Sequence, residues 1–392
     1  MPWQTLTPMS VRQQFIEAVL TRPSTFRALC AEFGISEKTG YKWRARFLAG
    51  GPAALADQSR APHVAPHQPP AAVREAILEL REAHPTWGAR KLKAVLTRRH
   101  PTTAWPAAST ITTLCKRAGL VPTRRRKDPA ATRWATARLT PADAPNRVWA
   151  TDFKGEFRLR TGAYCYPLTV TDLYSRYLLG CQALASTAGA PVQQAYQALF
   201  QRYGLPDVIR SDNGIPFAHP HALGGLSPLS VWWIRLGIRP ERTTKGKPTE
   251  NGAHERMHRT LKAEAARPEG SLDAQQRRFA RWQQEFNTER PHEALGLTPP
   301  ASHYVPSERP WPRRLPLLDY AAHLPLRRVR PNGGIRYQQR DIWLSTTLSG
   351  EYVALTEQSD DRWCITFGPL QLGHWIASDD TFEPDLQWID HP

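Results

Sequence analysis

The chain has 392 residues, enough for roughly two to four domains that each bury their own core. It contains no apolar run approaching the length of about 18 residues that a membrane helix needs, and its first residues do not resemble a secretory signal. Its five cysteines are widely spaced and form no C-x-x-C pair. We therefore expect a cytoplasmic protein without a membrane partner, a disulfide framework or a cysteine zinc site.

The positive charge of the chain is concentrated in its first third. Residues 1–140 contain 23 Lys and Arg against 8 Asp and Glu, whereas the remaining 252 residues contain 29 against 27. The formal net charge of +17 therefore arises almost entirely from the N-terminal part. A segregated positive field attracts polyanions, so nucleic acid is the expected partner; the alternative is that these charges only keep the chain soluble.

Residues 1–57 are predicted to form a helix-turn-helix DNA-binding domain. An apolar helical segment breaks at Gly34, and Ser36 is placed to cap a second helix. The apolar residues that can form a small core are Phe26, Leu29, Phe33, Ile35, Trp43 and Phe47. The second helix then presents Lys38, Thr39, Lys42 and Arg46 to the DNA major groove. A plain helical hairpin has the same pattern and remains the alternative.

Two linkers and a second helical domain are predicted before residue 146. Residues 58–70 are rich in proline and histidine and lack periodicity, which indicates a linker. Residues 71–122 repeat the helical pattern and are predicted to form a second, divergent helix-turn-helix-like domain. Residues 123–145 are basic and poor in apolar side chains. They are interpreted as a basic linker that follows a phosphate backbone, or alternatively as a solvated tether.

From residue 146 onward, short β-branched and aromatic runs predict strands, and later strands alternate with helices. Residues 146–305 are therefore expected to form a mixed sheet with helices packed on it, within a multidomain α+β protein. Prolines mark another boundary near residue 304. Residues 306–392 alternate in short runs, with Asn332-Gly333 as a hairpin signal, and predict a small C-terminal β-barrel.

Three acidic residues stand out by their setting. Asp152 lies within or at the end of the first strand of this region, Asp212 follows a short apolar strand, and Glu255 lies on a helix. The helix residues expected to face the sheet are Ala253, Met257, Leu261 and Ala265, and those expected to face solvent are Glu255, His258, Arg259 and Lys262. Taken singly, each acid has an ordinary interpretation as a turn former or a solvated side chain.

Carboxylates gathered at one place would suit phosphodiester chemistry. Their hard oxygens favour Mg²⁺ or Mn²⁺, and two such ions about 3.5–4 Å apart can assist in-line displacement at phosphorus. Without a metal the three acids would repel one another and raise their pKa values. Basic residues one and two turns beyond Glu255 would then hold the DNA strand.

The motifs of this region resemble a known family. The segments WATDFKG, YPLTVTDLYSRYLLG, GLPDVIRSDNGIPF, NGAHERMHRTLKAE and FNTERPHEALGLTPPASHY resemble the integrase core of bacterial insertion-sequence transposases of the IS481/IS3 type, a group related to retroviral integrases. The resemblance covers roughly residues 146–305. It implies a ribonuclease-H-like fold with a mixed five-stranded sheet.

The resemblance also implies an activity and a set of functional residues. Asp152, Asp212 and Glu255 match the catalytic acids, which would bind two Mg²⁺ (or Mn²⁺) ions. Asn251, Arg259 and Lys262 would contact DNA. Arg290, Pro291 and His292 match the motif that closes the domain. The family hydrolyses a phosphodiester at the ends of a mobile element and transfers the freed 3′-hydroxyl into target DNA.

The expected partner is double-stranded DNA, both the terminal inverted repeats and the target. Further copies of the chain are expected to form a homo-multimer on paired ends, in the bacterial nucleoid.

Two features qualify the match. Forty-two residues separate Asp212 from Glu255, more than the family often has, and the excess is interpreted as a loop. Asp172 is a competing acid, interpreted as structural because other carboxylates fill the catalytic positions. The alternatives are a domesticated DNA-binding regulator and a ribonuclease-H-like nuclease that does not join strands.

Overall fold

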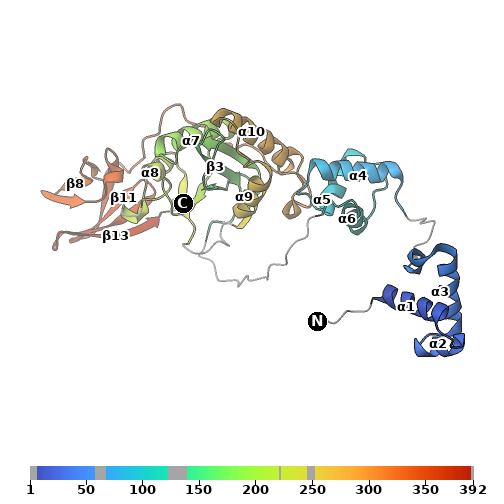
Figure 1. Ribbon diagram of the computed structural model, residues 1–392. Helices are drawn as coiled ribbons and strands as arrows, with labels where there is room; N and C mark the ends of the chain where they lie inside the picture. The colour runs from blue at the N-terminus through green and yellow to red at the C-terminus, as the bar shows by residue number, and fades with distance from the viewer. Residues whose placement is uncertain (1–6, 58–67, 122–138, 220–221, 245–251, 390–392) are drawn as a thin grey trace. The chain divides into compact units, whose positions relative to one another are not determined.

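The computed structural model describes residues 7–57, 68–121, 139–219, 222–244 and 252–389 (Figure 1). Asn251 and most of the two predicted linkers lie outside the described residues. The chain divides into two compact units, residues 1–69 and residues 70–392. Among the described helices, none combines the length and the apolar character that a bilayer crossing requires.

The first unit is a small helical domain. Its elements are α1 (Pro8–Thr21), α2 (Phe26–Glu32), α3 (Glu37–Gly50) and a 3₁₀ turn at Pro52–Leu55. The predicted cap is confirmed, because the Ser36 hydroxyl accepts a hydrogen bond from the Thr39 amide at 3.3 Å. Gly34 makes the turn before this cap with a φ of +62°. Gly40 lets α3 approach α2, since a Cβ there would lie 2.6 Å from the Cys30 sulfur.

The second unit begins with three helices, α4 (Ala71–Ala83), α5 (Ala89–Arg99) and α6 (Ala108–Arg117). They enclose a small core of Ile77, Leu80, Trp87, Leu92, Val95, Leu96, Ile111 and Cys115. The guanidinium group of buried Arg81 ties the ends of this helical group together, because it donates to the carbonyl oxygens of Trp87 and Leu120. Its burial is tolerated because its hydrogen bonds are made.

Polar contacts join these three helices to two later helices, α9 (Gly252–Glu264) and α10 (Leu272–Thr288). The His84 Nδ1 lies 3.0 Å from a Glu285 carboxylate oxygen, and Arg99 pairs with Glu289 at 2.9 Å. The Thr86 hydroxyl donates to the Glu264 carboxylate at the end of α9. Acidic groups on α9 and α10 therefore face basic and polar groups of the helical domain.

A mixed β-sheet forms the centre of the second unit. Its strands are β1 (Val148–Phe153), β2 (Phe157–Arg158), β3 (Tyr164–Asp172), β4 (Leu178–Leu184), β5 (Val208–Ser211) and β6 (Arg239–Arg242). The order is β2-β3-β1-β5-β6, with β4 also paired to β3. β3 is antiparallel to β1 and β4, whereas β5 is parallel to β1 and β6. The sheet has six strands rather than the predicted five, because the chain continues along β3 as the two-residue β2.

Helices cover both faces of this sheet (Figure 1). On one face, α7 (Gly189–Tyr203) and α8 (Pro228–Arg235) pack through aromatic side chains such as Tyr196, Phe200 and Trp233. On the other face, α9 and α10 pack through Met257, Leu261, Phe279 and Trp282 against Cys165 and Cys181. The predicted loop before α8 ends at Ser227, which caps that helix.

The C-terminal part is an open antiparallel sheet rather than the predicted barrel. Its strands are β7 (Leu326–Arg328), β10 (Tyr352–Ser359), β11 (Arg362–Phe367), β12 (Leu370–Ile376) and β13 (Thr381–Trp388), and β8 (Gly334–Tyr337) with β9 (Arg340–Trp343) forms a separate hairpin. In the order β13-β12-β11-β10-β7, neither end strand pairs with the other, so the described sheet does not close.

The hairpin turn in this part also differs from the prediction. Gly333 does turn the chain with a φ of +85°, but the turn precedes β8 instead of joining two paired strands. The hairpin is made by Gln338 and Gln339, both with positive φ. Glutamine gives no sequence signal for such a turn, which is why it was not predicted.

A buried ion pair anchors the start of the core sheet. Arg210 on β5 donates from Nε to Glu241 on β6 at 2.6 Å, and the two side chains are only 8% and 10% exposed. Thr140 joins this pair through its amide and carbonyl groups, at 2.8 Å from Glu241 and 2.7 Å from Arg210. The segment that leads into β1 is therefore fixed to the parallel strands.

This pair gives a stability prediction. Arg210→Met should cost about 3–5 kcal/mol, because it leaves the Glu241 carboxylate buried without its cation. Adding Glu241→Gln should recover part of that loss, since glutamine still accepts from Thr140. Urea unfolding of both variants measures this. Arg22→Met breaks the half-exposed Arg22–Glu32 pair and should cost below about 1 kcal/mol. Equal losses for Arg210→Met and Arg22→Met would contradict the anchoring role.

Candidate active site

Asp152 and Asp212 lie side by side at one edge of the central sheet. In the parallel pairing of β1 with β5, Ala150 stands opposite Arg210. Asp152 follows Ala150 by two residues on β1, and Asp212 follows Arg210 by two residues, directly after β5 ends, so the two acids lie at the same end of the sheet. The parallel register thus brings together two residues that are 60 positions apart in the sequence.

Asp212 also makes the turn that its ordinary interpretation predicts. One of its carboxylate oxygens accepts a hydrogen bond from the Gly214 amide at 3.0 Å, and Asn213 donates from its side chain to the Thr243 carbonyl at 2.9 Å. The side chain of Asp212 is nevertheless exposed. Turn formation holds the carboxylate in place and leaves oxygen lone pairs available for a ligand.

Glu255 comes from a third element, the first turn of α9. Its side chain is exposed and makes no hydrogen bond or ion pair with any other residue that the structure describes. Its negative charge nevertheless acts on Asp152. Glu255 is therefore close enough to raise the pKa of Asp152, and no bond to a described residue fixes its rotamer.

The environment of Asp152 opposes ionisation. Burial, followed by the neighbouring carboxylate of Asp212, raises the pKa of Asp152 to about 7, and Glu255 adds to the rise. The amide of Phe153 and the charge of Lys154 act in the opposite direction. At this edge of the sheet, burial and the two neighbouring carboxylates together outweigh the Phe153 amide and Lys154, so the ionised form of Asp152 is disfavoured.

The donor chemistry of these acids fits a divalent cation, because hard carboxylate oxygens are what Mg²⁺ and Mn²⁺ prefer. The raised pKa of Asp152, caused first by burial and then by the neighbouring carboxylates, is consistent with this fit, since a bound cation would offset both effects by favouring the ionised form. In the described part of the chain, no three His, Cys, Asp or Glu side chains are already arranged to hold a metal ion. The structure brings Asp152 and Asp212 together, and Glu255 would complete the set by turning its side chain.

The predicted position of His258 on α9 is wrong. His258 was expected on the solvent face beside Glu255, but it is 7% exposed, and His254 is 1% exposed. The buried stripe of the helix runs through residues 254, 257, 258, 261 and 265, which is the ordinary spacing of a buried helical face. The two rings lie 4.6 Å apart and contact the hydroxyl groups of Thr169 and Thr171 on β3.

These four buried polar residues are functional candidates that were not predicted from the sequence. Burial lowers the pKa of His258 to about 3 and lowers the pKa of His254 well below its usual value, so both rings are neutral. The sequence did contain a signal, namely two histidines one helical turn apart on either side of Glu255 and two threonines spaced for one face of a strand.

The far end of α9 is held by an ion pair. Buried Arg290 donates to the Glu264 carboxylate at 2.5 Å, and the Trp282 indole donates to the same carboxylate at 2.7 Å. His292, in the same motif, packs its ring against Phe286. Arg290 therefore supports the helix that carries Glu255, whereas His292 packs on α10.

Other predicted residues occupy distinct positions. Arg259 and Lys262 are exposed on α9, as expected. Asp172 is fully buried and accepts hydrogen bonds from the Ser175 amide and hydroxyl at 2.7 and 2.5 Å and from the Asn146 amide at 2.7 Å. Both oxygens of Asp172 are thus used within the protein, which agrees with its structural interpretation.

In the first unit, the predicted DNA-contacting residues lie on α3. Lys38 and Lys42 are exposed, whereas Thr39 and Arg46 are half-buried. The cationic groups of Lys42 and Arg46 lie 5.1 and 5.0 Å from the centre of the Trp43 ring. α3 therefore exposes Lys38 and Lys42, and the cationic groups of Lys42 and Arg46 lie near the Trp43 ring.

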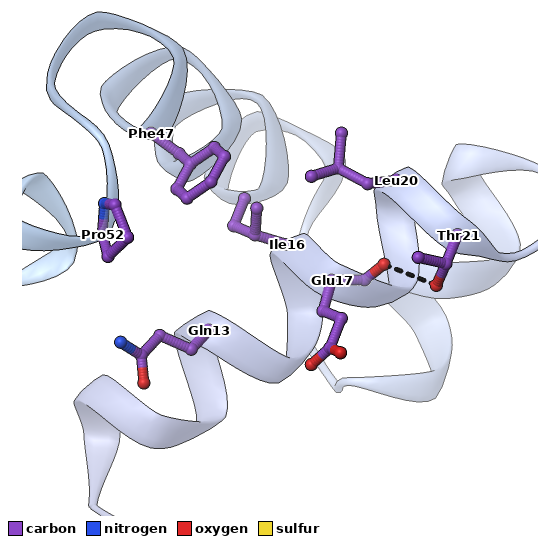
Figure 2. Close-up of a pocket in the computed structure, with 7 residues that line it drawn as sticks. All are labelled: Gln13, Ile16, Glu17, Leu20, Thr21, Phe47 and Pro52. Atoms are coloured by element: carbon purple, nitrogen blue, oxygen red, sulfur yellow. Dashed lines mark hydrogen bonds between the residues drawn. The ribbon is translucent and has the colours of Figure 1, made fainter.

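A shallow groove on the same unit does not have the features of an active site. It is lined by Gln13, Ile16, Glu17, Leu20, Thr21, Phe47 and Pro52, and Figure 2 shows Ile16, Leu20 and Phe47 around it. The Thr21 hydroxyl, drawn with a dashed line, donates to the Glu17 carbonyl within α1. The lining is largely apolar and brings no pair of catalytic groups together, so the acidic edge of the sheet remains the candidate site.

Comparison with protein families matches domains along most of the chain. The family described as an integrase core domain matches residues 142–248, and a second family with the same description matches residues 236–300. A helix-turn-helix domain matches residues 11–63, and a homeodomain-like domain matches residues 39–114. The integrase matches include Asp152, Asp212 and Glu255.

Three similar proteins come from mobile elements and viruses. A protein of insertion element IS407 from Burkholderia multivorans is 28% identical over 240 residues, which cover 60% of this chain and 82% of that protein. A putative transposase of IS986/IS6110 from Mycobacterium tuberculosis is 28% identical over 247 residues, covering 57% and 84%. The Gag-Pol polyprotein of baboon endogenous virus is 29% identical over 197 residues, covering 48% of this chain and only 10% of the polyprotein.

The raised pKa of Asp152 predicts a pH-dependent effect of Asp152→Asn. Below about pH 4 the carboxyl group is protonated in both states and costs nothing. Between about pH 4 and pH 7 the unfolded chain loses the proton that the folded chain keeps, so the free energy of unfolding falls as pH rises. Asp152→Asn should therefore stabilise the metal-free protein by roughly 2–4 kcal/mol at pH 8 and hardly at pH 4.

Urea unfolding in a chelator, at pH 4.5 and pH 8, measures this difference. The matched control is Asp319→Asn, the same chemical change in the C-terminal part of the chain, which should stabilise the protein less at pH 8 than Asp152→Asn does. A stabilisation by Asp152→Asn that does not change with pH would show that the carboxyl group is not held at a raised pKa.

Proposed function

This chain is related to insertion-element transposases through its integrase core and helix-turn-helix domains, and we propose that it is a DNA transposase that cuts at the ends of its element and joins them to target DNA. One observation carries the proposal. The carboxylates of Asp212, in the turn after β5, and of Glu255, on α9, both act on Asp152 of β1 at a single edge of the sheet, where the parallel pairing of β1 with β5 brings Asp152 and Asp212 together. Such a cluster is the protein part of a metal-dependent polynucleotidyl transferase site.

We assign Asp152, Asp212 and Glu255 as the ligands of Mg²⁺ or Mn²⁺, with two ions as the expected number. Bound there, the cations would supply Lewis-acid stabilisation of the charge that develops on the phosphate oxygens. The chain itself places the three carboxylates, holds Asp212 through its turn, and leaves Glu255 free to close on the site. Hydrolysis at the element end and attack of the freed 3′-hydroxyl on target DNA would use the same carboxylates.

DNA is the partner that the domain content supports. We propose that the first unit recognises the terminal inverted repeats through Lys38, Thr39, Lys42 and Arg46. The domain boundaries predicted from the sequence are part of this proposal. Arg259 and Lys262, one and two turns beyond Glu255, would hold the strand at the acidic edge; Asn251 is proposed with them but lies outside the described residues. We also propose that the protein acts as a homo-multimer that pairs the two ends of the element, in the bacterial nucleoid.

The acid triad is tested by Glu255→Gln. The variant should keep its affinity for terminal-repeat DNA, since Glu255 is exposed and bonds to none of the residues that the structure describes, and should lose Mg²⁺-dependent cleavage by at least about 100-fold. Binding is measured by fluorescence anisotropy and cleavage on a labelled repeat. Glu357→Gln, an exposed acid on β10, is the control and should cleave normally. Cleavage by Glu255→Gln at the wild-type rate would exclude Glu255 from the reaction. A separate assay with pre-cut ends distinguishes the two functions, since a transposase joins these ends to target DNA and a nuclease does not.

The helix-turn-helix assignment is tested by the double change Lys38→Ala and Lys42→Ala. If both ammonium groups neutralise phosphates, the slope of log K against log salt should fall by about 2 in magnitude, because each contact contributes about 0.9. Arg202→Ala, an exposed cation on α7, should leave the slope unchanged. A slope in the double variant equal to that of the wild type would place the repeat-binding surface elsewhere.

A further inference from the structure

Two buried histidines lie directly beneath the acidic edge. His254 and His258 project from the inner face of α9 onto β3, the strand that pairs with β1 and Asp152. The Thr169 hydroxyl is the centre of this contact. It lies 3.0 Å from the main-chain carbonyl oxygen of Asp152, 2.8 Å from His254 Nε2 and 2.7 Å from His258 Nε2.

The protons of this cluster can be assigned by counting donors. The Thr169 hydroxyl has one proton and two lone pairs, and the Asp152 carbonyl can only accept. All three contacts are hydrogen bonds only when the hydroxyl donates to that carbonyl and both histidines donate from Nε2. His254 Nδ1 then accepts from the Thr171 hydroxyl at 2.9 Å, which completes the bonding of that ring.

The same count leaves a lone pair on His258. A neutral imidazole that carries its proton on Nε2 has none on Nδ1, and burial of the ring favours the neutral form. His258 Nδ1 lies 3.7 Å from the Asp152 carboxylate oxygen Oδ2, too far for a hydrogen bond. When Asp152 is ionised, as a bound cation would keep it, two acceptors face each other, an arrangement that suits a proton donor placed against both.

We propose that His258 is a positioning residue whose Nδ1 accepts a hydrogen bond from water bound to the divalent cation at Asp152. This inference rests on the proposed function, because it requires a cation at that carboxylate. His258 would orient a coordinated water by accepting a hydrogen bond from it at Nδ1, while its Nε2 keeps α9 against β3 through Thr169. An imidazole that only spaced the helix from the sheet would use Nε2 alone.

Two substitutions separate these roles. In His258→Gln the side-chain amide reaches the place of Nε2 and can donate to Thr169, but nothing replaces Nδ1. In His258→Asn the amide oxygen stands near the place of Nδ1 and the bond to Thr169 is lost. We expect His258→Gln to keep the thermal midpoint and the affinity for terminal-repeat DNA, and to lose about 10- to 100-fold in Mn²⁺ affinity and in cleavage. His258→Asn should be less stable but should bind Mn²⁺ more tightly than His258→Gln.

Mn²⁺ binding to the full chain is followed by electron paramagnetic resonance without DNA, so the readout does not depend on activity. The inference is overturned if His258→Gln binds Mn²⁺ as tightly as the wild type while Asp152→Asn does not bind it; the proposed function then stands. If Asp152→Asn, Asp212→Asn and Glu255→Gln all bind Mn²⁺ and cleave normally, the proposed function itself fails.

A measurement on the unaltered protein covers the case in which both His258 variants unfold. With histidine labelled by ¹⁵N, His258 should show the Nε2–H tautomer, and the Nδ1 resonance should move when Mg²⁺ is added. A proton on Nδ1, or an Nδ1 resonance that ignores saturating Mg²⁺, would overturn the proposal.

Discussion

Carboxylates at one edge of the central sheet repel one another, and the rest of the core must be stable in spite of this repulsion. Asp152 and Asp212 are forced together by the parallel register of β1 and β5, and the half-buried setting of Asp152 weakens the screening between them. Lys154 offsets this repulsion only in part, and buried contacts elsewhere hold the elements that carry the acids. Two uncharged or internally neutralised anchors do this.

The first anchor is the cluster of two neutral histidines and two threonines between α9 and β3, and the second is the Glu264–Arg290 pair with the Trp282 indole at the other end of α9. Neither anchor adds a free charge to the acidic edge. Both fix the helix that carries Glu255, while the Glu255 side chain itself stays unconstrained. The helix position is thus determined by buried contacts, and only the last few bonds of one side chain remain to be set by a ligand.

Sequence reasoning succeeded where the physical cause was local. Ser36 was predicted as a cap from its place before a helix, and Asp172 as structural because other acids filled the catalytic positions; in the structure both side chains make the corresponding hydrogen bonds. It failed where the cause was a long-range contact. His258 was placed on the wrong face of α9, because its buried position depends on Thr169 at a distance of 89 residues. The open C-terminal sheet was predicted as a barrel because alternation along a strand does not reveal whether the end strands pair.

The Glu264 carboxylate has one more consequence. It is shared by Arg290 and Trp282 of the core and by Thr86 at the corner between α4 and α5. α9 is a rigid rod about 20 Å long, with Glu264 at one end and Glu255 in its first turn. A displacement of the α4–α5 corner would strain this junction at one end of α9, whereas Glu255 lies near the other end, between the buried rings of His254 and His258. The helical domain therefore contacts the helix that carries Glu255 at the end of α9 that lies away from the acidic edge.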